Sequence, residues 1–226
     1  MERTLVLDLD GTLAETAGDL IGALNFVLGR EGIDPVPVEA ARSLLGAGGR
    51  ALIQRGFERA GRTLDKITLD ALFAEFLSHY NAHIADHSTL FPGVEASLDR
   101  FQVAGWRLAV CTNKLEYSSR LLLKKLGVID RFAFICGQDT FGVAKPDPKP
   151  LLETIRRIGG APAGAVMVGD SVTDIRTAKA AEVPVVAVDF GYTDVPVTEL
   201  GPDRVISHFD DLFEAALALT RDAAET

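Results

Sequence analysis

The sequence lacks long hydrophobic runs. No stretch of about 18 consecutive apolar residues occurs in this chain of 226 residues, so an ordinary transmembrane helix is not expected. The first residues also lack a basic segment followed by an apolar one and a cleavage site, the features of a secretory signal peptide. These two absences lead us to expect a cytoplasmic protein with no membrane partner.

Positive charge is scarce relative to negative charge. The chain has 23 Lys and Arg residues against 32 Asp and Glu residues, a formal net charge of −9. Because nucleic acids bind basic surfaces through their phosphate backbones, this balance argues against a nucleic-acid partner. It is compatible with a small anionic substrate, which needs positive charge only where it binds.

Cysteine is also scarce. Cys111 and Cys136 are the only two cysteines, and each lies in a short apolar stretch. They could pair, but small buried thiols in core strands are the favoured interpretation for an intracellular protein. The sequence instead contains 47% hydrophobic residues, enough for one large domain or for a domain that carries a smaller inserted one.

Hydrophobic periodicity divides the chain into two kinds of segment. An apolar run at residues 4–7 predicts a buried strand, and only helical spacing follows for about seventy residues. Helices and strands then alternate, which is typical of a mostly parallel sheet with helices on both faces. We predict a doubly wound α/β core formed by residues 1–14 and 88–226, with a helical insertion at 15–87. The later strands are expected at residues 106–111, 132–136, 165–168 and 184–188.

Two carboxylates follow the first predicted strand. Asp8 and Asp10 are two residues apart, so they point to the same side of the sheet, and Gly11 permits a turn after them. At about 4 Å and an effective dielectric near 20, two such charges repel by roughly 4 kcal/mol. A divalent cation with oxygen ligands would offset this repulsion. The alternative is a solvated turn, in which Asp-Gly is common.

Further polar side chains follow the other predicted strands. In open parallel sheets, ligands bind at the carboxyl ends of the strands, so these side chains should meet at one edge. Carboxylates are suited to Mg²⁺, and a lysine with small polar groups is suited to phosphoryl oxygens. The residues concerned are Thr112, Asn113, Lys145 and Asp170.

These segments resemble the four motifs of the haloacid dehalogenase-like hydrolases and occur in the order found in that family. The resemblance implies a Rossmann-like core, with the helical insertion as the family's cap domain. Within the family the chain is most similar to phosphoglycolate phosphatases, including two late segments, Phe190-Gly191-Tyr192 and Gly201-Pro202-Asp203-Arg204. The four motifs here are Asp8-Leu9-Asp10-Gly11-Thr12, Thr112-Asn113, Lys145-Pro146-Asp147-Pro148 and Gly169-Asp170-Ser171-Val172-Thr173-Asp174.

The resemblance implies a role for each matching residue. Asp8 would attack phosphorus and form an aspartyl-phosphate intermediate. Asp10 would protonate the leaving alkoxide and later deprotonate water; the dehalogenase branch lacks this second aspartate, so phosphoryl transfer is favoured. Mg²⁺ would bind the carboxylates of Asp8 and Asp170 and the backbone carbonyl of Asp10. The phosphoryl oxygens would be bound by Thr112, Asn113 and Lys145, and Lys145 would also neutralise charge on the nucleophile.

Several of these residues also have a structural interpretation. Lys145 could be a surface lysine that precedes a proline-led helix. Asp174 lies three residues after Ser171, the spacing of a capping box, so we expect both to support the metal site without binding the ion directly. Lys114, directly after the second motif, could add positive potential at this edge or could simply be solvated.

A glycine-rich segment, Gly46-Ala47-Gly48-Gly49-Arg50, lies between two predicted helices of the insertion. It follows a helix and lacks a Gly-Lys-Ser or Gly-Lys-Thr sequence, so it is neither a dinucleotide fingerprint nor a phosphate loop. Gly48 and Gly49 would let the backbone approach a substrate closely, and Arg50 could bind its carboxylate through two hydrogen bonds. The alternative for Arg50 is an ordinary exposed arginine.

Three histidines, His79, His83 and His87, recur every four residues and would share one face of a continuous helix. This spacing could indicate a transition-metal site. We do not favour that interpretation, because zinc normally takes its ligands from more than one element.

The resemblance implies a Mg²⁺-dependent phosphatase that acts on a small phosphorylated metabolite, with 2-phosphoglycolate preferred, as a monomer or homodimer. A sugar-phosphate phosphatase, a pyrophosphatase and a phosphoglucomutase are alternatives within the family. A phosphonatase would need a lysine in the cap, where Lys66 is the only one. Outside enzymes, the alternative is a phosphate-binding regulatory protein. The pairing of Asp8 with Asp10 argues against it, since binding requires neither a nucleophile nor a proton donor.

Overall fold

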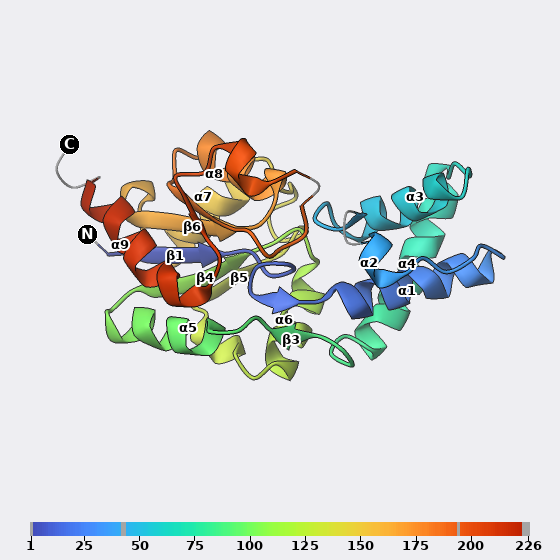
Figure 1. Ribbon diagram of the computed structural model, residues 1–226, viewed down its shortest axis with the longest axis horizontal. Helices are drawn as coiled ribbons and strands as arrows, with labels where there is room; N and C mark the ends of the chain where they lie inside the picture. The colour runs from blue at the N-terminus through green and yellow to red at the C-terminus, as the bar shows by residue number, and fades with distance from the viewer. Residues whose placement is uncertain (1, 42–43, 194, 223–226) are drawn as a thin grey trace.

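A parallel sheet forms the centre of the larger part of the molecule. The computed structural model describes residues 2–41, 44–193 and 195–222. Within them, a six-stranded sheet has the order β5-β4-β1-β6-β7-β8, and all of its neighbouring strands pair in parallel (Figure 1). The strands are β1 (Thr4–Leu7), β4 (Arg107–Cys111), β5 (Phe134–Cys136), β6 (Ala165–Gly169), β7 (Val185–Val188) and β8 (Arg204–Ile206).

Helices cover both faces of this sheet, so side chains that alternate along a strand enter two different cores. In β1, Leu5 and Leu7 belong to one hydrophobic cluster and Val6 to the other. The first cluster includes residues of α5 (Val94–Val103), α6 (Glu116–Lys125) and α9 (Leu212–Asp222). The second includes residues of α7 (Lys149–Arg157) and α8 (Val172–Ala180). The predicted doubly wound α/β fold is therefore confirmed.

The strand order reverses direction at β1. From β1 the chain passes to β4 and β5 on one side, and it then returns to β6, β7 and β8 on the other. In doubly wound folds, such a switch point creates a crevice at the carboxyl ends of the strands. The segments that follow β1, β4 and β6 therefore meet at the centre of this edge.

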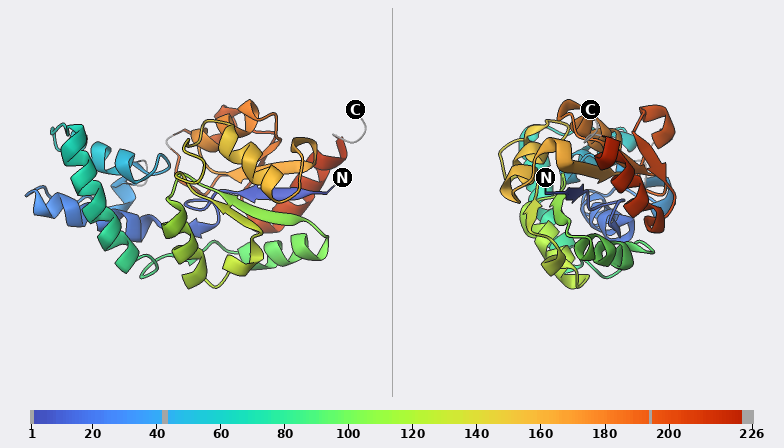
Figure 2. Two further views of the ribbon diagram at one scale, coloured as in Figure 1. Left: turned by 180° about the vertical axis from the view of Figure 1, so that it is seen from behind. Right: turned by 90° about the vertical axis from the view of Figure 1, so that its left-hand side faces the viewer.

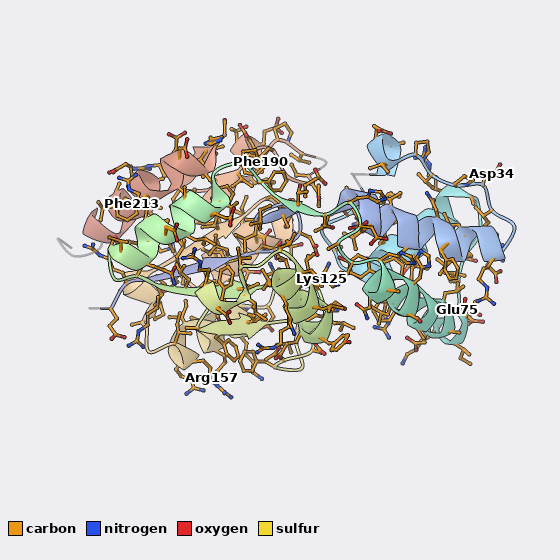
Figure 3. All side chains as sticks on the ribbon, turned by 90° about the horizontal axis from the view of Figure 1, so that it is seen from below. Asp34, Glu75, Lys125, Arg157, Phe190 and Phe213 are labelled. Carbon is orange, nitrogen blue, oxygen red and sulfur yellow. The ribbon has the colours of Figure 1, made fainter. Side chains whose placement is uncertain are left out.

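A second group of helices lies beyond the carboxyl ends of the strands, at the end of the molecule opposite both chain termini (Figures 1 and 2). This helical group consists of α1 (Ala17–Arg30), α2 (Val38–Ala41), α3 (Gly49–Arg59) and α4 (Lys66–Ala82). Figure 3 places Asp34 and Glu75 in this group and Arg157 and Phe213 on the sheet side. No helix in the described ranges is both long and apolar enough to cross a membrane.

Two short connections join the helical group to the sheet. The strands β2 (Ala14–Glu15) and β3 (Thr89–Leu90) pair in antiparallel orientation, so the outgoing and returning chains run side by side. The carboxylate of Asp19, in the first turn of α1, accepts hydrogen bonds from the backbone N–H groups of His87 and Ser88 at 3.0 and 2.9 Å. It also accepts one from the Ser88 hydroxyl at 2.6 Å.

The expectation that three histidines share a helical face is wrong for His87. Helix α4 ends at Ala82, and His87 lies in the connection to β3. His79 stacks on the ring of Phe26 with ring centroids 4.2 Å apart. The imidazole Nδ1 of His83 lies 2.7 Å from a carboxylate oxygen of Asp86.

The two cysteines lie in core strands, as expected. Cys111 in β4 and Cys136 in β5 are direct neighbours in the strand register, and both are buried free thiols. The sequence-based prediction ended at the strand 184–188, and the structure adds β8 and α9 beyond it.

Candidate active site

The first predicted motif follows β1 directly. Asp8 continues the strand, because its backbone N–H donates a hydrogen bond to the carbonyl of Val168 at 2.9 Å. The chain then turns at Gly11, which has a φ of 81°. A Cβ at this position would lie 2.5 Å from Oδ2 of Asp170, so a side chain would collide with the neighbouring acid. The turn predicted from the sequence is therefore present, and it brings the first motif against the fourth.

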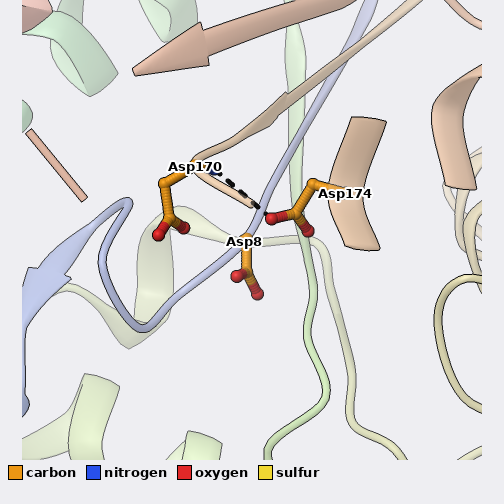
Figure 4. A group of neighbouring side chains, drawn as sticks. All are labelled: Asp8, Asp170 and Asp174. Atoms are coloured by element: carbon orange, nitrogen blue, oxygen red, sulfur yellow. Dashed lines mark hydrogen bonds between the residues drawn. The ribbon is translucent and has the colours of Figure 1, made fainter. Parts of the chain in front are cut away.

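Three carboxylates converge at this edge of the sheet. Asp8, Asp170 and Asp174 are all buried, and each offers an oxygen atom within 4.8 Å of the others (Figure 4). The backbone N–H of Asp170 donates to Oδ2 of Asp174 at 3.3 Å, which is the dashed line in Figure 4. Asp10 does not belong to this cluster.

Both oxygens of Asp174 are engaged by the protein. Its Oδ2 accepts hydrogen bonds from the backbone N–H and the hydroxyl of Ser171, at 3.1 and 2.6 Å. Its Oδ1 accepts one from the ammonium of Lys145 at 2.5 Å. Ser171 and Asp174 form the predicted capping box at the start of α8.

Asp170 is held by two donors from distant parts of the chain. The Thr12 hydroxyl donates to its Oδ1 at 2.8 Å, and the backbone N–H of Tyr192 donates to its Oδ2 at 2.7 Å. A Cβ at Gly191 would lie 2.2 Å from the Cβ of Asp170, so the loop after β7 packs closely against this side chain.

Lys145 is buried within the carboxylate cluster. Its ammonium lies 3.0 Å from Oδ1 of Asp8, and only 2% of its side chain is exposed. The surface interpretation of this lysine is therefore wrong. Burial opposes its charge, but Asp174 and Asp8 outweigh that effect and raise the pKa of the Lys145 ammonium.

One ammonium does not balance three carboxylates. Burial, with a further contribution from Asp174, raises the pKa of Asp8 from 3.8 to about 6. Burial, with Asp174 and Asp8, also raises the pKa of Asp170 well above its ordinary value. The Oδ1 of Asp8 accepts no hydrogen bond from the described residues, despite its proximity to Lys145. Excess negative charge and hard oxygen donors fit a divalent cation such as Mg²⁺.

A pocket lies beside the cluster, between the sheet edge and the helical group. On the sheet side, Asp8, Asp10, Thr112 and Asn113 line it. The side contributed by the helical group is mostly apolar. Its described residues are Leu20, Leu45, Gly46, Gly48, Gly49, Leu52, Phe73, Phe76, Leu77 and Tyr80.

Thr112 and Asn113 both face this pocket, but the side chain of Asn113 is engaged elsewhere. Its Oδ1 accepts from the backbone N–H of Lys145 at 2.9 Å, and its Nδ2 donates to the Lys145 carbonyl at 3.0 Å. Asn113 thereby positions the loop that carries the lysine. The predicted contacts of Thr112 and Asn113 with phosphoryl oxygens stay predictions.

The glycine-rich segment of the helical group approaches the sheet edge, but its arginine does not enter the pocket. A Cβ at Gly48, which has a φ of 87°, would lie 3.2 Å from the carbonyl oxygen of Asn113. The Arg50 guanidinium donates two hydrogen bonds to Oδ1 of Asp70, at 3.1 and 3.0 Å, and lies 3.9 Å from the centroid of the Phe73 ring. Arg50 is half-exposed and does not line the pocket.

Lys114 has a role at the site that the sequence left open. Its ammonium donates to both carboxylate oxygens of Asp10, each at 2.8 Å, and 6% of its side chain is exposed. The Thr16 hydroxyl also donates to Oδ1 of Asp10 at 2.8 Å. The solvated interpretation of Lys114 is therefore wrong, and Asp10 has its own cationic partner.

Two other residues near the site carry no local sequence signal for their contacts. The hydroxyl of Tyr192 accepts hydrogen bonds from the backbone N–H groups of Thr16 and Ala17, at 2.6 and 3.0 Å. The carboxylate of Asp19, in the first turn of α1, accepts hydrogen bonds from the backbone N–H groups of His87 and Ser88 in the connection to β3. The similarity of the Phe190-Gly191-Tyr192 segment to the family pointed to Tyr192, and no sequence feature pointed to Asp19.

Comparison with known proteins agrees with this architecture. Residues 5–188 match the family profile of the haloacid dehalogenase-like hydrolases. The chain therefore belongs to the haloacid dehalogenase-like hydrolase family, as its motifs predicted.

Its relatives include phosphoglycolate phosphatases. The chain is 50% identical to one from Mesorhizobium japonicum, with 97% of each chain covered. It is 44% identical to one from Caulobacter vibrioides, with 96% of this chain and 91% of the relative covered. A solved structure described as a predicted phosphoglycolate phosphatase, from Haemophilus somnus, has a TM-score of 0.88 at 27% identity and covers 94% of this chain and 97% of its own.

Proposed function

We propose that this chain, a phosphoric monoester hydrolase similar to phosphoglycolate phosphatases, hydrolyses 2-phosphoglycolate to glycolate and phosphate in the presence of Mg²⁺. The observation that supports this reaction most directly is the position of Asp8, which lies beside the pocket, next to Lys145 and Asp170. The identity to phosphoglycolate phosphatases over nearly the whole chain supports the substrate.

Mg²⁺ would be held by the carboxylates of Asp8 and Asp170 and by the backbone carbonyl of Asp10. When bound, it would neutralise the carboxylates and the charge of the phosphoryl group. Asp174 would not be a ligand in this proposal, because its Oδ1 pairs with the Lys145 ammonium and its Oδ2 completes the capping box of α8. It orients Lys145 and the loop that carries Asp170.

The chemistry proceeds in two displacements. Thr112, Lys145 and the second N–H of the Asn113 amide hold the phosphoryl oxygens while a carboxylate oxygen of Asp8 attacks phosphorus. The bond from phosphorus to the leaving oxygen breaks, and Asp10 gives that oxygen a proton, which releases glycolate. Asp10 then takes a proton from water, the water oxygen attacks phosphorus, and the phosphoryl–Asp8 bond breaks to release phosphate.

The helical group would serve as a cap over this site, formed by residues 15–87 as predicted from the sequence. Its apolar residues line the pocket, and its two connections run side by side through β2 and β3. Movement about these connections would admit the substrate and then exclude water.

The test is release of phosphate by the purified protein from 2-phosphoglycolate, a sugar phosphate, pyrophosphate and p-nitrophenyl phosphate, with and without Mg²⁺. We expect Mg²⁺-dependent turnover, with the highest kcat/KM for 2-phosphoglycolate. Asp8→Asn should lower kcat by roughly 10³-fold or more, because it removes the nucleophile. Asp34→Asn, at an exposed position of the helical group, is the matched control.

Two results would contradict the proposal. A folded Asp8→Asn variant with nearly wild-type activity would exclude the aspartyl-phosphate route. Binding of phosphate without any turnover would instead support the regulatory alternative.

A further inference from the structure

We propose that Lys114 and Tyr80 form a subsite for a carboxylate on the leaving group. The preferred substrates would then be phosphate esters of small hydroxy acids. This inference rests on the proposed phosphatase function and assigns the recognition of the leaving group to two residues for which the sequence suggested no such role.

The position of Lys114 relative to Asp10 supports the first half of the subsite. Asp10 is the proposed proton donor to the leaving oxygen, so whatever binds Asp10 lies beside the leaving group. The Lys114 ammonium has three N–H donors, and two of them are directed at the oxygens of Asp10. The Tyr80 side chain also lies close enough to interact with this ammonium. The third N–H can therefore be directed at Tyr80 or at a ligand in the pocket that lies beside both residues.

The hydroxyl of Tyr80 supports the second half. Tyr80 is on α4, lines the same pocket and is 2% exposed. Its ring centroid lies 4.6 Å from Nζ of Lys114. Its hydroxyl makes no hydrogen bond of ordinary geometry in the described part of the chain, although Lys114 is close enough to interact with it, and its O–H proton has no acceptor there. Buried hydroxyl groups are rarely left unpaired, so an unpaired one at a pocket indicates a place for a ligand atom.

One cationic side chain in the pocket is placed to bind an anionic leaving group, although Asp8 and Asp10 also line it. Among its described lining residues, Lys114 is the only cation. A carboxylate could accept one hydrogen bond from Lys114 and one from Tyr80, and a charge-assisted bond of this kind is strong in an environment shielded from water. The described side chains of the helical group that line the rest of the pocket, such as Leu20, Phe73 and Phe76, are mostly apolar and offer few partners to the hydroxyl groups of a sugar.

Arg50 is less suited to this role in the structure. Its guanidinium is paired with Asp70, is half-exposed and does not line the pocket. A variant at Arg50 therefore provides a direct comparison between the two ways of recognising a carboxylate.

The experiment compares two substrates that differ only at the leaving group's end. 2-Phosphoglycolate carries a carboxylate where ethyl phosphate carries a methyl group, and kcat/KM is measured for both with Mg²⁺. We expect the ratio of the two values to fall by roughly 10-fold in Tyr80→Phe and by roughly 100-fold in Lys114→Met, mainly through KM. Tyr117→Phe and Lys124→Met, at exposed positions of α6, are matched controls that should retain the wild-type ratio.

A purely structural role would lower both kcat/KM values equally and leave their ratio unchanged, which would overturn the subsite. The same conclusion would follow if Arg50→Ala lowered the ratio while Tyr80→Phe did not. A wild-type protein with no preference for 2-phosphoglycolate over ethyl phosphate would also refute it, although the phosphatase proposal would stand.

Calorimetric titration keeps the two proposals separable, because it does not require turnover. Glycolate and inorganic phosphate are each titrated into the Mg²⁺-loaded protein and into its Tyr80→Phe and Lys114→Met variants. The subsite predicts a larger loss of affinity for glycolate than for phosphate in both variants. That result in a protein without turnover would support the subsite and refute the proposed function. Equal losses for both ligands would refute the subsite.

Discussion

Lys145 is the shared counter-charge of two carboxylates that come from different strand ends. Asp8 follows β1, and Asp174 lies in the first turn of α8, after β6. Both acids are buried, and both have an oxygen within 3.0 Å of the Lys145 ammonium. Because charges removed from water need a partner, loss of this lysine would leave two buried carboxylates without their counter-charge.

We expect Lys145→Met to lower the free energy of unfolding by about 3–5 kcal/mol in the absence of Mg²⁺, since the fully buried Asp174 loses its cationic partner. Urea denaturation measures this change. Lys149→Met, an exposed lysine at the start of α7, should change stability by about 0.5 kcal/mol or less. Equal stabilities of the two variants would show that the Lys145 ion pairs do not stabilise the fold.

At the scale of elements, the start of α1 is attached to the sheet edge from several sides. The Thr16 hydroxyl donates to Asp10, and the first backbone N–H groups of the helix donate to the Tyr192 hydroxyl. Asp19 then binds the returning connection at His87 and Ser88. These bonds link the position of the helical group to the loops that carry Asp10 and Asp170.

Asp19→Ala should loosen this junction, because two backbone N–H groups and one hydroxyl lose their buried acceptor. We expect the free energy of unfolding to fall by about 2–3 kcal/mol. Hydrogen exchange at the amides of His87 and Ser88 should become faster, and Asp34→Ala should leave both measurements unchanged. Unaltered exchange at these two amides in Asp19→Ala would contradict the proposed linkage.

At the scale of the whole molecule, the pocket exists only because two parts of the chain face each other. The sheet edge supplies the carboxylates and the lysines, and the helical group supplies an apolar wall. Neither part contains the complete set of groups that a phosphate ester with a carboxylated leaving group would contact.

Binding of Mg²⁺ should stabilise the whole molecule in a pH-dependent way. In the metal-free protein, the pKa of Asp8 is raised from 3.8 to about 6, so the folded state favours the protonated carboxyl. The stability that this protonation contributes is lost as the pH rises through about 6. Mg²⁺ requires the ionised carboxylate, so its stabilising effect should be larger at about pH 7.5 than at about pH 5.

Thermal unfolding measures this effect. At a Mg²⁺ concentration about 100-fold above Kd, we expect Tm to rise by roughly 5–10 °C at the higher pH. Asp170→Asn should abolish most of the increase. A rise in Tm that is the same at both pH values would contradict the assignment of the metal to these carboxylates.

Local patterns predicted much of the fold correctly. Continuous apolar runs identified β1, β4 and β6, and the spacing of Ser171 and Asp174 identified the capping box. The two-residue strands β2 and β3 are too short to show a period, and their pairing depends on residues 76 positions apart, Ala14 and Leu90. The sequence favoured Arg50 as a ligand of the substrate carboxylate, with an exposed arginine as the alternative, and it could not show that Asp70 lies within hydrogen-bonding distance of this guanidinium.

The sequence by itself determined which polar groups end the strands and in what order, because a strand followed by a turn is a local property of the chain. Only the tertiary structure decided which charges became partners: Lys145 with Asp8 and Asp174, and Lys114 with Asp10. Lys114 and Asp10 are 104 positions apart, and their contact depends on how the sheet orders its strands. The physical reason is that burial and ion pairing depend on distances in space, which spacing along the chain does not specify.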